Sequence, residues 1–175
     1  GNFKSGSITA VQAIYVPADD FTDPAVQTIS KYLNTRIFLS RKQGSLGIFP
    51  AIDPLLSSSN LLHPELVGQR HYNTAKSVKN IFRKYEELQD IISIFGLDDL
   101  TEEQLNIVNK ARKLRNFFSQ PMFSAEKFTN NTGKMVSLED TINCCEKIIN
   151  GTFDHLHEEK FYMIGGMDDI NLQSK

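Results

Sequence analysis

Residues 75–104 read AKSVKNIFRKYEELQDIISIFGLDDLTEEQ, and this stretch decides the fold. From Ala75 to Phe95 the apolar residues recur every three or four positions, at 75, 78, 81, 82, 85, 88, 92 and 95. This spacing is typical of one face of an α-helix. Gly96 ends the pattern, and Thr101-Glu102-Glu103-Gln104 forms a capping box that starts another helix. The stretch therefore predicts two helices joined by a short acidic turn.

The chain on both sides of this stretch, from about residue 60 onward, also predicts helices. Pro64 suits the first turn of the long helix, so we expect that helix to begin there and to end at Phe95. The second helix should end before Ser119-Gln120-Pro121. Ser137 caps a third helix that closes at Gly151, and a short fourth helix is expected around 157–161. These elements predict an all-α C-terminal bundle.

The first 60 residues have a different pattern. Residues 7–16 alternate with apolar residues on both faces, which predicts a buried strand. Asp23-Pro24 starts a helix through Leu33, and further strands are expected at 35–39 and 46–52 with a turn at 41–44 between them. The run SSSN at 57–60 is typical of a linker. We predict an α/β fragment, the closing strands of a nucleotide-binding domain, in residues 1–67, and the helical domain in residues 68–175.

The composition argues against a nucleic-acid-binding protein and against a membrane-spanning protein. The chain is 40% hydrophobic and 23% charged with a net charge of −2, which is globular composition without the positive excess of a nucleic-acid binder. No apolar stretch reaches membrane-spanning length, and the first residues do not resemble a signal peptide. These features predict a soluble intracellular protein with no nucleic-acid partner.

No catalytic or metal-binding motif is present in the 175 residues. Gly133-Lys134 is followed by Met135, so it is not a P-loop, and neither G-x-S-x-G nor H-E-x-x-H occurs. His155 and His157 lack companions at metal-ligand spacing. Cys144 and Cys145 are adjacent on a predicted helix, so we expect two free thiols. We predict no catalytic residue and no metal ligand in this chain.

Several segments, in order along the whole chain, together resemble one family. They are GSITAVQAIYVPADDFTDP at 6–24, LGIFPAIDPL at 46–55, GLDDLTEEQ at 96–104, SQPMFSAEKFT at 119–129, FDHL at 153–156 and FYM at 161–163. The chain resembles the C-terminal part of the catalytic β subunit of the F-type rotary ATP synthase. The third segment is similar to that family's DELSEED sequence, and YVPADD at 15–20 is similar to the catalytic β type.

The resemblance implies an enzyme only as part of a larger subunit. The family's P-loop, magnesium-binding acid and general base lie upstream of the matched region, so the chain alone is expected to be inactive. The full-length subunit would use ATP or ADP with Mg²⁺. It would alternate with α subunits in a hexamer around a central γ shaft, coupling ATP synthesis or hydrolysis to proton transport. That complex is peripheral, on the cytoplasmic face of a bacterial membrane or inside an organelle, and meets the membrane only indirectly.

The resemblance also assigns nucleotide-binding residues. Phe49 stands at the adenine-stacking position, and residues of the helical domain form the other wall of that pocket. Met122 stands there in place of the family's usual Phe. Tyr15 corresponds to a tyrosine near the phosphates, and Tyr72 to a residue that reaches the non-catalytic nucleotide. The implied set is Tyr15, Phe49, Tyr72, Met122, Ala125 and Phe128.

Two segments are implied to touch the shaft. One is the loop with Asp20, Thr22 and Asp23. The other is the tip between the two long helices, which forms the main lever and comprises Asp98, Asp99, Leu100, Thr101, Glu102 and Glu103.

Four departures from the family pattern leave alternatives open. They are Met122, Asn34, Asn60 and Asn130, the last at a position where the family usually has Gly. They fit a fast-evolving lineage, or a β-like subunit of a specialised rotary ATPase that does not make ATP. A stand-alone helical module that binds proteins and no nucleotide is the alternative from another class.

Overall fold

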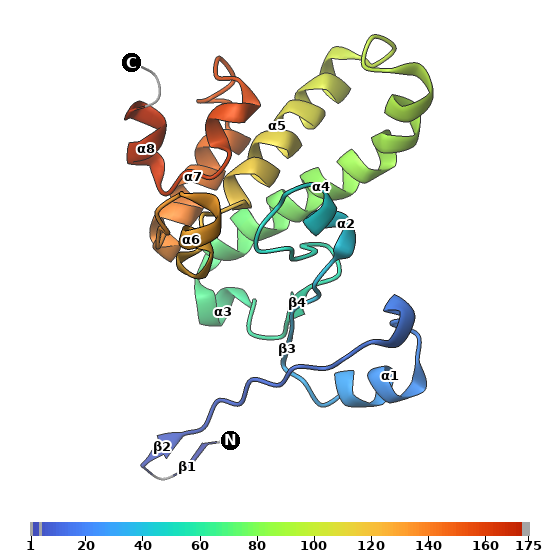
Figure 1. Ribbon diagram of the computed structural model, residues 1–175, viewed down its shortest axis with the longest axis vertical. Helices are drawn as coiled ribbons and strands as arrows, with labels where there is room; N and C mark the ends of the chain where they lie inside the picture. The colour runs from blue at the N-terminus through green and yellow to red at the C-terminus, as the bar shows by residue number, and fades with distance from the viewer. Residues whose placement is uncertain (1, 4, 173–175) are drawn as a thin grey trace.

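The computed structural model describes residues 2–3 and 5–172 and confirms the predicted fold class (Figure 1). The first part contains short elements: β1 (Asn2–Phe3), β2 (Gly6–Ser7), η1 (Pro17–Asp19), α1 (Pro24–Ser30), β3 (Thr35–Arg36), α2 (Arg41–Ser45) and β4 (Ser58–Ser59). The second part is helical: α3 (Pro64–Val67), α4 (Gln69–Phe95), α5 (Glu102–Phe118), η2 (Phe123–Ala125), α6 (Glu126–Thr129), α7 (Leu138–Ile149), η3 (Glu158–Phe161) and α8 (Met167–Leu172).

Helix α5 is the centre of the helical part. It packs against α4 on one side and against α7 and η3 on the other. The core around it includes Leu114 and Phe117 from α5, Cys144 from α7, and Phe161, each at most 1% exposed. Burying one such large apolar side chain stabilises the fold by about 1.5–3 kcal/mol. The α5 sequence therefore decides where its neighbours lie.

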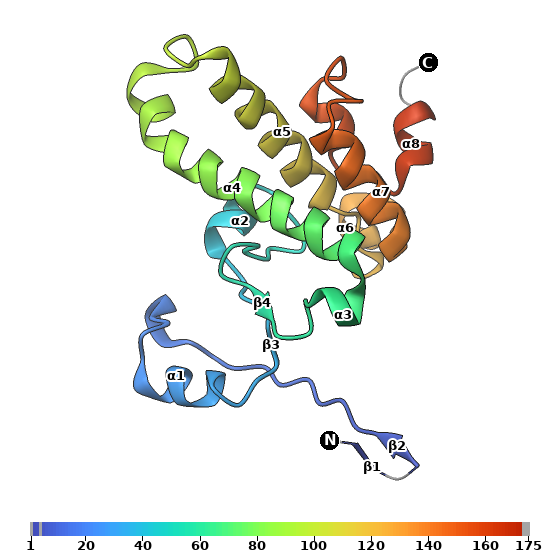
Figure 2. The same cartoon turned by 180° about the vertical axis from the view of Figure 1, so that it is seen from behind.

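A second, smaller cluster lies farther along the α4–α5 hairpin, toward the tip. Leu88, Leu100 and Val108 are buried there, and Leu97 and Leu105 pack against them. The side chain of Thr101 accepts the Gln104 N–H while Gln104 accepts the Thr101 N–H, which confirms the capping box. The hairpin thus carries its own core close to the loop that joins its helices (Figures 1 and 2).

The helix starts predicted from the sequence are mostly confirmed. Asp23 caps α1 by accepting from the N–H groups of Ala25 and Val26, and Ser137 caps α7 by accepting from Asp140. One difference concerns the long helix, which is divided into α3 and α4 at Gly68. Gly68 has φ 83°, a conformation that glycine adopts without steric cost and that interrupts an α-helix. The domain boundary after residue 67 stays a prediction.

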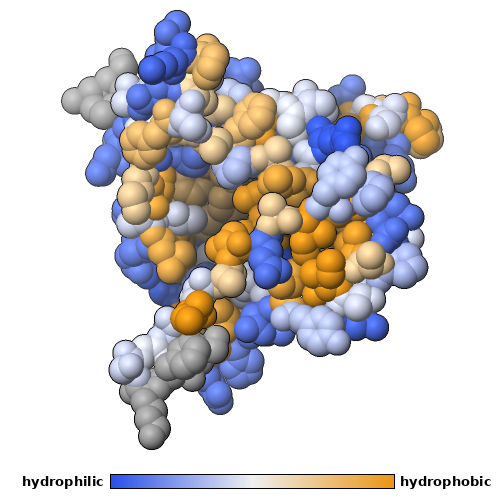
Figure 3. All heavy atoms as spheres, turned by 60° about the horizontal axis from the view of Figure 1, so that its bottom comes forward, coloured by the Kyte–Doolittle hydropathy of each residue, from blue (hydrophilic) through white to orange (hydrophobic). Residues whose placement is uncertain are grey.

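The predicted buried strand at 7–16 is wrong. Beyond Ser7 this segment forms no strand, and Ile8, Val11 and Tyr15 are exposed. A strand with two apolar faces is buried only between neighbouring strands and helices. The described residues provide one short partner, β1, which pairs with β2. The segment therefore extends away from the rest of the chain (Figure 1). Figure 3 shows apolar side chains gathered on the face of the molecule next to this segment.

The region from residue 35 to residue 60 also differs from the expectation. Ser40 caps helix α2 where a turn was expected, and of the strand expected at 46–52 only Ile52 pairs, in a single bridge with Leu39. Pro50, inside that stretch, lacks the N–H group that a strand ladder requires. The run expected as a linker instead forms β4, whose Ser59 hydroxyl lies 2.7 Å from that of Thr35 on β3.

The two cysteines are free and buried within α7, as predicted. Burial raises the pKa of each thiol to about 12, and the neighbouring Cys145 and Glu146 add smaller effects. Both side chains therefore behave as small apolar groups of the core. None of the described helices has the length and apolar content needed to cross a membrane.

Arg70 joins the start of α4 to α7. Its guanidinium donates to both carboxylate oxygens of Glu146, at 2.9 and 2.7 Å, and also to Glu139 and Asn143. The Arg70 hydrogen bond lowers the pKa of Glu146, and Thr74 contributes a smaller effect in the same direction. The charged form of Glu146 is therefore favoured in the folded state.

This network predicts a pH dependence of stability. The lowered pKa of Glu146 stabilises the fold above the unfolded glutamate pKa of about 4.3, and this stabilisation is lost as the pH falls through the folded pKa. Arg70→Gln should therefore lower the unfolding free energy at pH 7 and make it less sensitive to acid. Urea unfolding between pH 7 and pH 3 checks this. Arg83→Gln, a change at an exposed position of the same helix, is the control. Parallel pH profiles for wild type and Arg70→Gln would contradict the prediction.

Candidate functional site

Phe49 is held by the helical domain through both of its backbone groups. Its N–H donates to the Ser119 hydroxyl at 3.2 Å, and its carbonyl accepts from the Gln120 N–H at 2.7 Å. Ser119 and Gln120 directly follow α5, so this segment connects Phe49 to the centre of the helical core. The Phe49 side chain remains 44% exposed, which leaves part of its ring open to a ligand.

The segment implied to form the opposite wall begins at Met122, two residues after Gln120. Met122 is 42% exposed and Phe128 is 88% exposed, while Ala125 is partly buried. The structure therefore brings the backbone of this wall next to that of Phe49. Among the described residues no ring contact joins Phe49 to Phe128. Each of the two rings is therefore open to a flat ligand from solution without first separating from the other.

The wall segment is closed into a loop by its own backbone. The Lys134 N–H donates to the Pro121 carbonyl at 3.1 Å, and the Gly133 N–H donates to the Glu126 carboxylate at 2.7 Å. Asn130 ends α6 with φ 56°, in the left-handed region. Asparagine is the residue that best replaces glycine in this conformation, which explains the departure from Gly at this position.

Tyr15 and Tyr72 lie apart from this loop. Tyr15 is 81% exposed in the extended N-terminal segment, and no hydrogen bond, ion pair or ring contact between described residues joins it to Phe49. Tyr72 is partly buried in α4 and lines a separate hollow of about 450 Å³. The other residues lining that hollow include three cations, and the full set is Leu62, Lys76, Ser77, Lys79, Asn80 and Arg83. The hollow therefore suits an anionic group.

The tip between α4 and α5 is acidic and exposed. Asp98, Asp99, Glu102 and Glu103 are all exposed, and the last two occupy the first turn of α5, where the helix dipole favours negative charge. Leu100 differs from the rest of the predicted set because its side chain is only 7% exposed and packs inside the hairpin. Leu100 therefore stiffens the tip and does not present a side chain to a partner.

The loop with Asp20, Thr22 and Asp23 is ordered by its own carboxylates. Asp20 accepts from the Thr22 hydroxyl and N–H, and these bonds lower the pKa of Asp20. Asp23 is already engaged as the cap of α1. The loop and the tip do not touch. They lie toward the same edge of the molecule in Figures 1 and 2, separated along its long axis.

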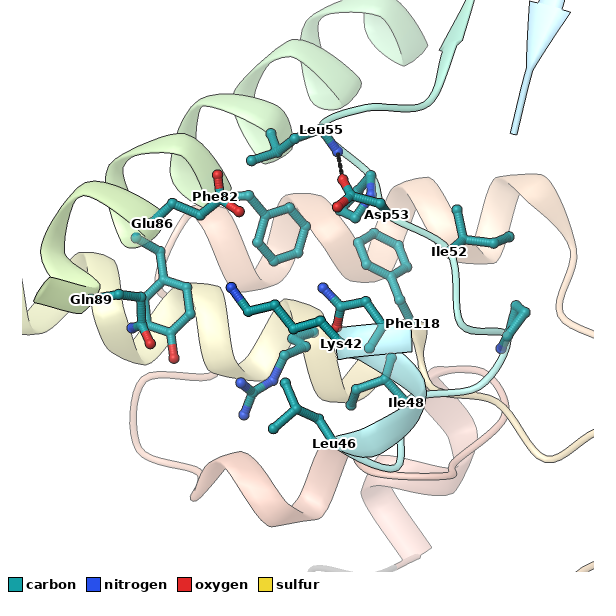
Figure 4. A pocket seen from close by; sticks show the side chains of 15 residues that line it. Lys42, Leu46, Ile48, Ile52, Asp53, Leu55, Phe82, Glu86, Gln89 and Phe118 are labelled. Atoms are coloured by element: carbon teal, nitrogen blue, oxygen red, sulfur yellow. Dashed lines mark hydrogen bonds between the residues drawn. The ribbon is translucent and has the colours of Figure 1, made fainter. Parts of the chain in front are cut away.

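A cavity of about 350 Å³ lies at the seam between the two parts of the chain (Figure 4). Phe82 of α4 and Phe118 of α5 line one side, and Leu46 and Ile48 line the other. Gln43 Oε1 and Arg115 Nε, in two further lining residues, are buried without a hydrogen-bond partner. The seam is therefore incompletely packed.

Within residues 5–172 no group of three or more His, Cys, Asp or Glu side chains is arranged to hold a metal ion. The sequence reasoning missed the roles of Ser119 and of Gly133. The sequence indicates Ser119 as the end of a helix and as part of the family-like segment 119–129, but it does not show that the hydroxyl is fully buried and requires a partner. Gly133-Lys134 is one of the segments that resemble the family, but the sequence does not show why glycine is required, because the close neighbour of Gly133, Phe123, lies ten residues away.

Comparisons with known proteins place both parts of the chain in one group. Residues 1–59 match the family described as the nucleotide-binding domain of the ATP synthase alpha/beta family. Residues 62–157 match the family described as the C-terminal domain of V and A type ATP synthase. The second match alone covers more than half of the chain.

Two solved structures share the fold. The unique ATP synthase subunit NeqB from Nanoarcheaum equitans matches with a TM-score of 0.72 and 24% identity, over 87% of this chain and 36% of that one. The assembled ATPase EscN of the enteropathogenic E. coli type III secretion system matches with a TM-score of 0.62 and 24% identity, over 78% and 31% of the chains. The chain thus spans about a third of the length of either protein.

Gly133→Ala should disturb the wall segment. An added Cβ would lie 2.5 Å from the Phe123 backbone nitrogen and 2.6 Å from its Cα, so the segment must shift. We expect the unfolding free energy to fall by about 1–3 kcal/mol, the usual cost of forcing an atom into packed structure. Chemical denaturation checks this. Gly6→Ala is the matched control, because an added Cβ there meets nothing within 4 Å. Equal stability of the two variants would refute the close approach.

Proposed function

The chain belongs to the rotary ATP synthase family, and we propose that it is the C-terminal part of a catalytic β-type subunit. In this proposal the helical domain supplies one wall of the adenine pocket, and its acidic tip transmits motion to a central shaft. The proposal assigns adenine contacts to Phe49, Met122, Ala125 and Phe128. Tyr15 would lie near the phosphates, and Tyr72 near the nucleotide of a neighbouring α subunit.

One observation carries the adenine assignment. Both backbone groups of Phe49 bind residues 119–120, immediately before the segment that bears Met122 and Phe128. Residues from the two halves of the chain, about 70 positions apart, therefore meet where the family's adenine pocket would lie. Their side chains remain partly or largely exposed, as an open binding surface requires. Stacking of a base on one aromatic ring contributes about 1–3 kcal/mol of binding energy.

The shape and charge of the hairpin support the lever role. A lever must not bend, and the cluster of Leu88, Leu100 and Val108 gives the hairpin its own core near the tip. Four exposed carboxylates at the tip complement a basic surface on a partner. The loop with Asp20 and Thr22 faces the same edge of the molecule, so one elongated partner could contact both.

The seam cavity supports a movement between the two parts. Nucleotide binding would close the helical domain over the adenine, and such closure requires the seam to repack. A cavity lined by Phe82, Phe118 and Ile48 leaves room for these side chains to approach one another (Figure 4).

The proposal assigns the magnesium and phosphate sites, and the partner subunits, to segments and chains other than the residues described. The residues present do not fit a magnesium ion, since no acidic cluster of the described chain is arranged for one and the sequence has no P-loop. In the proposal, Mg²⁺ and the phosphates are bound by other segments of the full-length subunit. Its partners are α subunits and a γ shaft in a hexamer, which is peripheral to the membrane through which it couples to proton transport. ATP synthesis by that complex under an imposed proton gradient would assign it to the synthases, and hydrolysis alone to a specialised branch.

Phe49→Ala in the complete subunit should weaken ATP binding by about 5- to 150-fold, because the stacking contribution is lost. Phe49→Tyr keeps the flat ring and should bind ATP as the wild type does. Equilibrium titration with ATP checks both variants. Wild-type affinity in Phe49→Ala would reject the adenine assignment.

Neutralising the tip should uncouple nucleotide chemistry from rotation. The change is Asp98→Asn, Asp99→Asn, Glu102→Gln and Glu103→Gln in the assembled complex. Because these side chains are exposed and lie at the start of α5, whereas Phe49 is bound by the residues after its end, we expect normal ATP affinity and reduced torque in single-molecule rotation. Replacement of both aspartates by glutamate keeps the charge and serves as the control. Unchanged torque in the neutralised complex would reject a role for tip charge.

A further inference from the structure

A second connection to the Phe49 segment comes from the C-terminal end of the chain. The Tyr162 hydroxyl donates to the Gly47 carbonyl at 2.9 Å, across 115 positions of sequence. The next residue, Met163, donates its N–H to the Ser119 carbonyl at 3.2 Å. Ser119 therefore binds both Phe49 and Met163. Three separated segments meet in one hydrogen-bonded group, which we name the Ser119 junction (Gly47, Phe49, Ser119, Tyr162 and Met163).

The buried member of this junction is Ser119, which has no exposed surface. Its hydroxyl accepts from the Phe49 N–H and lies 3.9 Å from Met163 Sδ, to which it donates. Without this hydroxyl the Phe49 N–H would lose its acceptor. Because a hydrogen bond is directional, this hydroxyl constrains the orientation of the Phe49 N–H, which apolar contact alone does not.

The Tyr162 side of the junction rests on the helical core. Phe161 and Ile164, on either side of the pair 162–163, are at most 1% exposed, so this segment is anchored by buried neighbours. Gly47 meets it with φ 76°, and a Cβ at Gly47 would lie 3.3 Å from the Tyr162 hydroxyl oxygen. The hydrogen bonds of Tyr162 and Ser119 therefore connect the backbone at residues 47–49 to the buried core of the helical part.

We propose that Ser119 and Tyr162 are positioning residues that fix the Phe49 ring for the base of a bound adenine nucleotide. This rests on the adenine role proposed above. Neither residue need touch the nucleotide. The Ser119 hydroxyl accepts a hydrogen bond from the Phe49 N–H. The Tyr162 hydroxyl donates to the carbonyl of Gly47, two residues before Phe49. The two contacts oppose rotation of the backbone that carries the ring.

The test uses the complete subunit in its assembled complex, with two magnesium-loaded probes, ATP and inorganic tripolyphosphate. Tripolyphosphate has no base, so it reports binding at the phosphates alone. Ser119→Ala and Tyr162→Phe should each weaken ATP binding about two- to tenfold, the range for one lost hydrogen bond, and leave tripolyphosphate binding unchanged. Ser137→Ala, which removes the cap of α7, and Tyr32→Phe, at an exposed tyrosine, are the matched controls and should change neither affinity.

The outcomes separate this inference from the proposed function. If Phe49→Ala weakens ATP binding while Ser119→Ala and Tyr162→Phe do not, the positioning role is overturned and the adenine role stands. If the two variants weaken ATP and tripolyphosphate equally, they act through general stability, and the positioning role is again overturned. If Phe49→Ala leaves ATP binding unchanged, the adenine role itself fails. Tyr162→Phe retains the ring and its packing, so it keeps the test decisive should Ser119→Ala fail to fold.

Discussion

The packing of α5 between α4 and α7 is the constraint on which the rest of the structure depends. Val108, Ala111 and Leu114 have no exposed surface, so the face of α5 that carries them cannot rotate without opening the core. Two consequences follow at opposite ends of this helix. Its first turn presents carboxylates at the tip, and the residues after its last turn hold Phe49. One buried helix thus connects a charged surface to a candidate ligand site.

The sequence predicted the helical part well because its signals are local. The capping box at Thr101, the cap at Ser137 and the apolar spacing of α4 each depend on residues within a few turns of one another. The first 60 residues were predicted poorly because strands depend on partners. Alternation at 7–16 predicts a strand wherever neighbours exist, and the pairing of Ser58–Ser59 with Thr35–Arg36 joins residues about 23 positions apart.

The candidate site likewise has features that local sequence motifs indicate and others that depend on long-range contacts. Collinear motifs pointed to Phe49 and Phe128, but no local pattern could show that Ser119 accepts a hydrogen bond from a residue 70 positions earlier. The backbone contact between two of the departures, Asn34 and Asn60, tolerates a change of side chain at both positions. Asn60 donates its N–H to the carbonyl of Asn34 at 2.8 Å, a backbone interaction that any residue at position 34, and any residue except proline at position 60, can make. Met122 is the departure that would change the chemistry of the proposed adenine pocket, because it replaces an aromatic ring with a flexible thioether.

The two buried thiols have a practical consequence for measuring movements of this domain by fluorescent labelling. Cys144 and Cys145 are the only cysteines in the sequence, and a thiol whose pKa is raised to about 12 is almost entirely protonated at neutral pH. Maleimide dyes react with the thiolate, so the native chain gives a nearly silent background. Two cysteines introduced at exposed positions would then carry the donor and acceptor dyes. Fluorescence energy transfer could then follow the helical hairpin without first removing the natural cysteines from the core.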